Sequence, residues 1–83
     1  MKEAMLWNKD RTESVRASKI RNFGIYQEQL TLQRRGWKLL GWYNSNEYFY
    51  FGYFETEEET RRFLDEIHKQ IEGVAEGGRQ RER

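Results

Sequence analysis

The most regular pattern of apolar and polar residues lies between residues 57 and 72. Four apolar residues recur there at a spacing that places them on one face of a helix: Phe63, Leu64, Ile67 and Ile71. The preceding segment Thr56-Glu57-Glu58-Glu59 is a capping box, in which the Thr side chain and the third Glu satisfy each other's backbone amides. Gly73 stands where a left-handed C-terminal cap would end the helix. The pattern therefore predicts a helix over residues 57–72.

Two apolar segments precede this helix, Trp37–Tyr43 and Tyr48–Phe54. The residues between them, Asn44-Ser45-Asn46-Glu47, favour a turn because Asn and Ser side chains bond to nearby backbone, so a β-hairpin is predicted. Strict alternation gives the second strand two apolar faces, one with Tyr48, Tyr50, Gly52 and Phe54 and the other with Phe49, Phe51 and Tyr53. One face can cover the helix, and the other requires a second cover.

The N-terminal third of the chain predicts further strands. They form two pairs, each around a polar turn: Ala4–Asn8 with Ser14–Ala17, and Ile20–Tyr26 with Leu30–Gln33. A short helix over Tyr26–Arg35, ended by Gly36, is an alternative for the second pair. Residues 73–83 lack periodicity and carry three arginines, which is typical of a disordered charged tail.

Together these elements predict one α+β domain over residues 1–72, followed by the disordered charged tail over residues 73–83. We expect an antiparallel, mostly meander sheet of four to five strands, with the C-terminal helix packed on one face. The apolar stripe of the helix should meet one aromatic face of the strand over residues 48–54. Further core positions are expected at Trp7, Val15, Ile20 and Leu39.

Two segments carry a family resemblance: Met5-Leu6-Trp7-Asn8-Lys9-Asp10-Arg11-Thr12 and Phe51-Gly52-Tyr53-Phe54-Glu55-Thr56-Glu57-Glu58-Glu59. They resemble small proteins of no settled function on phages and integrative elements of Gram-positive bacteria. Those proteins open with an Asn-x-Asp-x-Thr hairpin and end with Leu-Gly-x-Tyr-x-Thr-Glu-Glu-x-Ala before one helix. Here Phe51 replaces an aliphatic residue of that pattern and Thr60 replaces Ala. The resemblance implies a mobile-element accessory protein and specifies architecture more than activity.

The composition excludes several classes of protein. The 83 residues include no Cys, so disulfides, thiolate metal sites and thiol nucleophiles are excluded. The chain has a single His. No run of about 18 apolar residues predicts a membrane-spanning helix, and no secretory signal is visible. We therefore expect a cytoplasmic protein with no cofactor. Aromatic residues make up 16% of the chain and concentrate between residues 37 and 54, which should be the centre of the fold.

The candidate catalytic groups have structural explanations. Glu57, Glu58 and Glu59 lie at a helix start, where they complement the helix dipole. His68 borders the apolar stripe with Asp65 one turn before it, but no Ser, Cys or metal-ligand partner accompanies them. We therefore expect no enzymatic activity.

Charge is divided unevenly along the sequence. Residues 1–38 hold nine basic and four acidic residues, a net +5, and residues 39–72 hold three basic and eight acidic residues, a net −5. Two copies could therefore attract each other, and the surplus aromatic face is expected to be an association surface. Basic residues beside aromatic strands also suit single-stranded DNA or RNA. Arg35-Gly36-Trp37 begins like an RNA-recognition strand, but Lys38 departs from that motif.

From these features we expect a non-catalytic binding protein of a phage or mobile element. It should inhibit or sequester a host component, a protein or a small nucleotide, as a homodimer or higher homo-oligomer. The expected binding residues combine aromatic rings for stacking with guanidinium groups for phosphate: Arg34, Arg35, Trp37, Trp42, Tyr50 and Tyr53. The alternative is a single-stranded nucleic-acid-binding protein that uses the aromatic hairpin and the basic N-terminal half.

Overall fold

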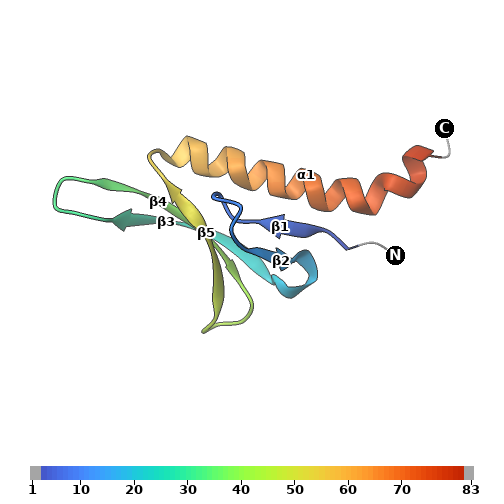
Figure 1. Cartoon of the computed structure of the whole chain (residues 1–83), viewed down its shortest axis with the longest axis horizontal. Coiled ribbons are helices and arrows are strands. Elements are labelled where there is room, and N and C mark those ends of the chain that lie inside the picture. The colour runs from blue at the N-terminus through green and yellow to red at the C-terminus, as the bar shows by residue number, and fades with distance from the viewer. Residues whose placement is uncertain (1–2, 82–83) are drawn as a thin grey trace.

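The computed structural model describes residues 3–81, and the side chains of residues 3–73. Its elements are, in order, β1 (Met5–Trp7), β2 (Ser14–Arg16), the short helical turn η1 (Ala17–Lys19), β3 (Asn22–Gln29), β4 (Arg35–Trp42), β5 (Tyr48–Phe54) and α1 (Glu57–Arg81) (Figure 1). The predicted α+β class, with antiparallel strands and one C-terminal helix packed on a sheet, is confirmed. The single meander sheet of four to five strands is wrong, because β1–β2 and β3–β4–β5 form separate sheets.

The first predicted hairpin is confirmed as β1 and β2, and its turn is closed by a side chain. The Asn8 side-chain oxygen accepts a hydrogen bond from the backbone N–H of Thr12 at 2.8 Å. Leu6 pairs with Val15, and both side chains are buried in the core. Because side chains alternate along a strand, the neighbouring Trp7 points the other way and is 40% exposed. The expected core position of Trp7 is therefore wrong.

The second hairpin, β3–β4, has longer strands than expected. Residues 22–29 pair continuously with residues 35–42, so Gln27-Glu28-Gln29 lies within β3 rather than in a turn. The turn is the segment 30–34, where the N–H of Leu30 bonds to the carbonyl of Arg34 at 2.9 Å. The predicted strand Leu30–Gln33 and the alternative helix over Tyr26–Arg35 are both wrong. The pairing with β4 runs along all eight residues of β3, and such a long-range interaction is not reported by the local sequence pattern.

The third hairpin, predicted from Trp37–Tyr43 and Tyr48–Phe54, is confirmed as β4 and β5. Its turn is also closed by an Asn side chain. The Asn44 side-chain oxygen accepts hydrogen bonds from the N–H groups of Asn46 at 2.7 Å and Glu47 at 2.9 Å. Asn at this position therefore has the turn-forming role that the sequence predicts.

A β-bulge interrupts the pairing of β4 with β5. Leu39 lies opposite Gly52 and the next residue, Leu40, lies opposite Tyr50. Phe51 is therefore an extra residue on β5 with no partner on β4. Such an insertion shifts the alternation of side chains by one position for the rest of the strand.

The bulge changes which side chains of β5 face the core. Three phenylalanines are buried on the helix side, with 8%, 1% and 4% of their surface exposed: Phe49, Phe51 and Phe54. Tyr53 lies opposite Lys38 on the other face of the sheet. The division of β5 by strict alternation is therefore wrong for Phe54, which faces the core, and for Tyr53, which does not.

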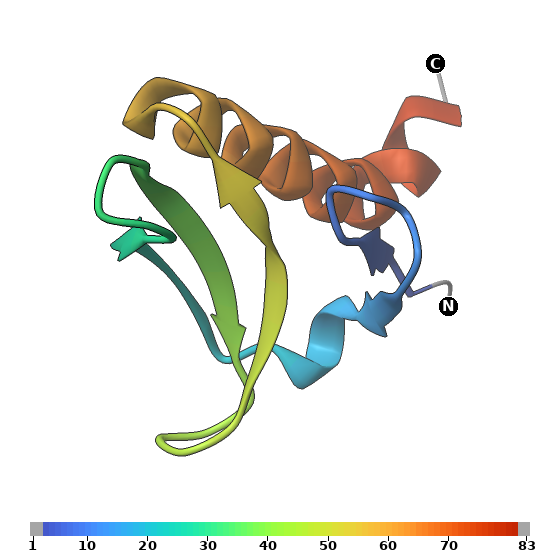
Figure 2. The same cartoon turned by 60° about the vertical axis from the view of Figure 1, so that its left-hand side comes forward.

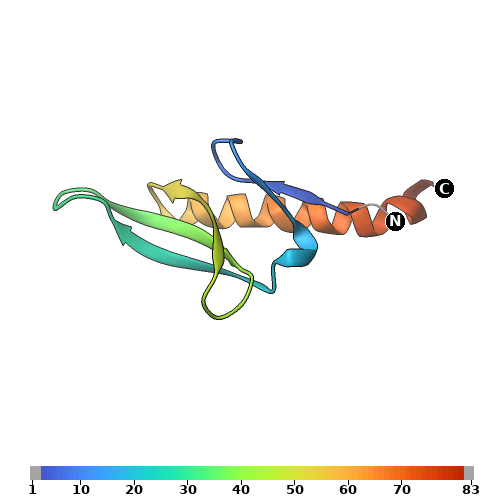
Figure 3. The ribbon, with the colours of Figure 1, turned by 60° about the horizontal axis from the view of Figure 1, so that its bottom comes forward.

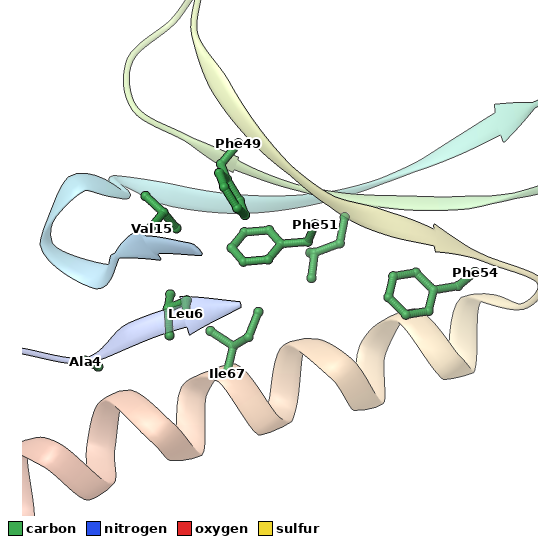
Figure 4. Packing of buried hydrophobic residues seen from close by; sticks show 8 residues of the cluster. Ala4, Leu6, Val15, Phe49, Phe51, Phe54 and Ile67 are labelled. Carbon is green, nitrogen blue, oxygen red and sulfur yellow. The ribbon is translucent and has the colours of Figure 1, made fainter. Parts of the chain in front are cut away.

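The core lies between the three-stranded sheet, α1 and the β1–β2 hairpin, with Leu6, Ile67 and Phe51 pointing toward one another (Figure 4). The Phe63 ring of α1 lies 5.3 Å from the ring of Phe54 and 6.3 Å from that of Phe51. The predicted contact between the helix stripe and β5 is thus confirmed. Three of the further expected core positions are also confirmed: Val15, Leu39 and the half-buried Ile20.

The helix α1 begins at the predicted capping box. The N–H of Glu59 donates to Thr56 Oγ1 at 3.1 Å, and the N–H of Thr56 donates to Glu59 Oε1 at 3.3 Å. The predicted helix end at Gly73 is wrong, because α1 continues to Arg81 (Figure 3). Side chains beyond Gly73, and residues 82–83 altogether, lie outside the described part of the chain. The disordered charged tail over residues 73–83 stays a prediction.

Candidate binding site on the outer face of the sheet

One face of the three-stranded sheet points away from α1 (Figure 2). The strand register places a layer of aromatic side chains on that face. The register places Trp42 opposite Tyr48, and Lys38 between Tyr26 and Tyr53. We define the outer face by the residues that share this side of the sheet: Tyr26, Glu28, Lys38, Leu40, Trp42, Tyr48, Tyr50 and Tyr53. They come from all three strands, so the β3–β4 turn and the bulge in β5 together bring them onto one surface.

The outer face combines exposed rings with a buried centre. Tyr26, Tyr48 and Tyr50 have 41%, 48% and 41% of their surface exposed. Leu40 lies opposite Tyr50 on the same side of the sheet, yet it is only 4% exposed. Because Leu40 points away from α1, the surrounding side chains of the outer face must cover it. The outer face is therefore a second, shallow apolar layer.

A hydrogen bond fixes Trp42 against Tyr26. The indole Nε1 donates to the Tyr26 hydroxyl at 3.0 Å, and the two rings stand at 86° with their centroids 6.4 Å apart. The Tyr26 ring lies over Gly24, where any side chain would displace it. Tyr48 meets the other side of this pair, with its ring 5.1 Å from that of Trp42. Two exposed rings and the half-buried Trp42 are thus held in defined orientations.

A polar cluster crosses the centre of the outer face. The Tyr50 hydroxyl donates to Glu28 Oε2 at 2.9 Å, and Lys38 Nζ lies 3.6 Å from Glu28 Oε1. Partial burial and the bond to Glu28 raise the pKa of Tyr50 to about 12. The hydroxyl therefore stays protonated above pH 10, where an ordinary tyrosine loses its proton, and keeps donating to Glu28. The opposite charges of Lys38 and Glu28 offset each other at this position.

Arg34 lies at the far end of the outer face, where it contacts Glu55 and Tyr53. Its guanidinium lies 2.6 Å from Glu55 Oε2 and 5.4 Å from the centre of the Tyr53 ring. The hydrogen bond to Glu55 and the charge of that carboxylate raise the pKa of Arg34. The Tyr53 ring lies over Gly36, where there is no side chain to displace it. The charge of Arg34 is therefore already paired within the protein.

The structure brings together four of the six residues expected to bind a partner or ligand: Trp42, Tyr50, Tyr53 and, beside them, Arg34. Arg35 and Trp37 alternate with the outer-face residues of β4 and so belong to the other side of the sheet. Both line a separate cavity of about 310 Å³ at the end of the β3–β4 hairpin. The six residues therefore do not form one site.

A cavity of about 390 Å³ lies at the end of the outer face where β3 begins. It is lined by Arg21, Asn22, Tyr26, Trp42, Asn44 and Ser45. The backbone N–H of Arg21 donates to the carbonyl of Trp42 at 2.7 Å, which holds the start of β3 against the end of β4. Arg21, Asn22 and Tyr26 are not among the expected site residues. The sequence could indicate that these residues belong to the site only through the register of β3 with β4. That register cannot be assigned before the β3–β4 turn is located.

The acidic residues at the start of α1 have partners on the helix itself. Glu57 pairs with Arg61 at 2.5 Å and Glu58 pairs with Arg62 at 3.5 Å. His68 stands edge-on to a phenylalanine ring of β3, with the ring centroids 5.6 Å apart. Within the described side chains, no group of three His, Asp or Glu residues is arranged to hold a metal ion.

The long helix α1 carries charged residues along most of its length. Over the residues that the structure describes, neither it nor any other helix has an apolar stretch long enough to cross a membrane. Comparison with protein-family models, with curated proteins and with solved structures finds no match for this chain.

Proposed function

We propose that the protein is a non-catalytic binding protein that inhibits or sequesters a component of its host cell through the outer face, and that it acts as a homo-oligomer. The observation that carries this proposal is the outer face itself, whose exposed rings are held in place by side-chain hydrogen bonds. The resemblance of two segments to phage and integrative-element proteins supplies the setting, a small accessory protein of a mobile element in the cytoplasm.

A rigid aromatic surface favours binding because its side chains lose little conformational freedom when a partner binds. Tyr and Trp offer a large contact area with few rotatable bonds, and they are enriched among the interface residues that contribute most of the binding energy. Immobilising a flexible side chain costs about 0.5–1.5 kcal/mol on association. The bonds from Trp42 to Tyr26 and from Tyr50 to Glu28 hold these rings before any partner binds. The outer face is therefore organised for contact in the free protein.

The groups that could be considered catalytic have other roles, which supports a binding function. Glu57 and Glu58 form ion pairs with arginines one turn further along α1. Glu59 completes the capping box with Thr56. Each carboxylate is thus used in starting and stabilising the helix.

The charges of the outer face favour a protein or small-molecule partner over a nucleic-acid strand. A strand of phosphates is bound by many cations that are free to replace counterions. Lys38 and Arg34 each already pair with a carboxylate, from Glu28 and Glu55 respectively. Single-stranded nucleic acid is the second candidate, supported by the exposed rings, which could stack on bases. Its affinity would fall steeply with salt, whereas that of an apolar protein contact would change little.

The exposed area sets the strength expected for self-association. The exposed fractions of Tyr26, Tyr48 and Tyr50 correspond to about 250 Å² of aromatic surface. A standard interface buries about 800 Å² on each partner, so a two-fold dimer centred on these rings must also include the polar rim. We therefore expect a weak dimer whose population rises with protein concentration.

Charge substitution on the outer face tests the proposal. Tyr48 is its most exposed ring, and Tyr48→Glu places a carboxylate where a partner would have to bury it. Leu32→Glu is the matched control, because Leu32 is 92% exposed in the β3–β4 turn, away from the outer face. Light scattering over a concentration series should show masses above 10.2 kDa for the wild type and Leu32→Glu, and the monomer mass for Tyr48→Glu. A wild type that remains at 10.2 kDa at millimolar concentration refutes the oligomer.

Capture of a partner from a host extract uses the same three proteins. A component retained by the wild type and by Leu32→Glu, and lost by Tyr48→Glu, supports binding through the outer face. Captured components that are retained equally by Tyr48→Glu show that another surface binds them and refute this part of the proposal.

A further inference from the structure

The cavity at the start of β3 has the shape and chemistry of a small ligand site. Its volume of about 390 Å³ is in the range of small-molecule sites, roughly 300–1,000 Å³. Two of its walls are the rings of Tyr26 and Trp42, which stand at 86° to each other. A planar ligand stacked on the indole would therefore meet the phenol ring beside it. The hydrogen bond between the two residues keeps this corner in place.

Hydrogen-bond donors in the cavity remain available to a ligand. The Tyr26 hydroxyl accepts the indole hydrogen, and its own hydrogen has no acceptor among the described residues. A hydroxyl that accepts one hydrogen bond is a better donor for the next, because the bonds polarise each other. Arg21 lines the same cavity, and its guanidinium forms no ion pair with a described carboxylate. One full positive charge and one polarised hydroxyl are thus free to bind an anion.

The electrostatic surroundings distinguish this cavity from three others in the described structure. It has a cation and no carboxylate in its lining. The cavities beside β2, at the end of the β3–β4 hairpin and under the β1–β2 turn each contain a glutamate as well as basic residues: Glu47, Glu28 and Glu66. An anion in any of those three cavities would be repelled by the carboxylate as well as attracted by the basic residues. Among the four, the Arg21 cavity is the one in which a cation acts on an anion without an opposing carboxylate.

We propose that this cavity binds a small planar aromatic anion of the chemical class of the nucleoside monophosphates. The base stacks on Trp42, and the phosphate accepts hydrogen bonds from the Arg21 guanidinium and the Tyr26 hydroxyl. Asn22 and Ser45 line the cavity and supply polar groups for the edge of the base. This proposal rests on the proposed sequestering function and deepens it, by naming a ligand class and a site at one end of the outer face.

Calorimetric titration of the full chain with adenosine monophosphate, adenosine and inorganic phosphate tests the assignment. If the phosphate and the ring are both recognised, adenosine monophosphate should bind at least about tenfold more tightly than either of the other two. Arg21→Gln should weaken the monophosphate at least about tenfold while leaving adenosine nearly unchanged. Tyr26→Phe should also weaken binding of the monophosphate more than binding of adenosine, but by a smaller factor than Arg21→Gln. Circular dichroism of each variant confirms that it is folded.

Arg35→Gln is the matched control, because Arg35 lines the cavity that also holds Glu28. Unchanged affinity in this variant supports the assignment, and a loss as large as that of Arg21→Gln shows non-specific attraction and refutes it. Absence of binding at millimolar ligand, or equal affinity for adenosine and its monophosphate, also refutes it. An oligoadenylate that binds more tightly than the monophosphate, with a steep salt dependence, assigns the site to nucleic acid instead. If capture still depends on Tyr48, the ligand class alone is wrong and the proposed function stands.

Discussion

The same substitution, glycine to alanine, should change stability in opposite directions at two positions of this chain. Gly52 lies in the β-bulge with φ at +155°, and an added Cβ would come within 2.7 Å of the Cβ of Lys9. Gly73 lies in α1, and an added Cβ would meet nothing within 4 Å. A methyl group is therefore excluded at the first position and accommodated at the second.

At Gly52 two unfavourable contributions add. Holding an L-residue in this region of φ costs about 1–3 kcal/mol. Lys9 cannot move aside without loss, because its backbone N–H donates to the Phe51 carbonyl at 2.6 Å and its ammonium donates to the Tyr53 carbonyl at 2.6 Å. We expect Gly52→Ala to lower the free energy of unfolding by about 2–4 kcal/mol. Domains of this kind are stable by about 5–15 kcal/mol, so the loss is a large fraction of the total.

At Gly73 the same substitution should raise the free energy of unfolding rather than lower it. Alanine is favoured over glycine inside a helix by about 0.8–1.0 kcal/mol, so Gly73→Ala should raise the stability by up to that amount. If Gly73 instead ended the helix in a left-handed cap, as the sequence alone predicts, alanine would cost about 1–2 kcal/mol. The sign of the change therefore decides between the two arrangements.

Urea unfolding followed by circular dichroism measures both variants. A Gly52→Ala protein within about 0.5 kcal/mol of the wild type contradicts the bulge geometry and the contact with Lys9. The double variant with Lys9→Gly separates the steric contribution, because removing the Lys9 Cβ should recover part of the loss and give a coupling of at least about 0.5 kcal/mol. A destabilised Gly73→Ala protein contradicts a helix that continues through this residue.

Three further predictions concern the core, the outer face and the helix cap. Phe51→Ala removes a ring that is 1% exposed and should lower the free energy of unfolding by about 3–5 kcal/mol. Trp37 is half-buried and lies outside the core cluster, so Trp37→Ala should lower it by less than half as much. The same urea assay measures both. The pKa of Tyr50 is raised from 10.0 to about 12, so the stabilisation from its protonated hydroxyl is complete below pH 10 and is lost as pH rises toward 12. Unfolding measured at stepped pH should show a shallower alkaline loss in Tyr50→Phe, and an unchanged slope contradicts the bond to Glu28. Thr56→Ala should cost about 1 kcal/mol and Thr56→Ser much less in thermal unfolding, and equal losses contradict the capping box.

The elements that can be predicted from the sequence are those with a local chemical signal. The capping box marks the start of α1, and the side chains of Asn8 and Asn44 close the two turns at which they were expected. The β3–β4 turn has no such signal. Its residues, Leu30-Thr31-Leu32-Gln33-Arg34, include no Gly, Pro, Asn or Asp, and the more polar Gln27-Glu28-Gln29 nearby looks more like a turn. Long-range pairing with β4 decides this turn, and a local pattern cannot report it.

The same limit applies at the other end of the chain. Gly73 is of the residue type that often caps a helix, but it lies within α1. A glycine ends a helix only where its backbone is left-handed, and Gly73 does not have that conformation. For the candidate site, the aromatic residues could be predicted as a group from their density along β4 and β5. Their sharing of a surface with Tyr26 and Arg21 could not, because it depends on the register of β3.

The bulge in β5 links the core to the candidate site. A strand with apolar residues at every position has no polar face to set its register, so its hydrophobic pattern cannot show which side each ring takes. In the structure, the unpaired Phe51 lets three phenylalanines enter the core where strict alternation would admit two of them and one tyrosine. The same shift moves Tyr53 to the outer face beside Arg34 and leaves Tyr50 there to bond to Glu28. Packing of the inner face thus determines which hydroxyl-bearing rings the outer face presents, and a change at Gly52 should disturb both surfaces together.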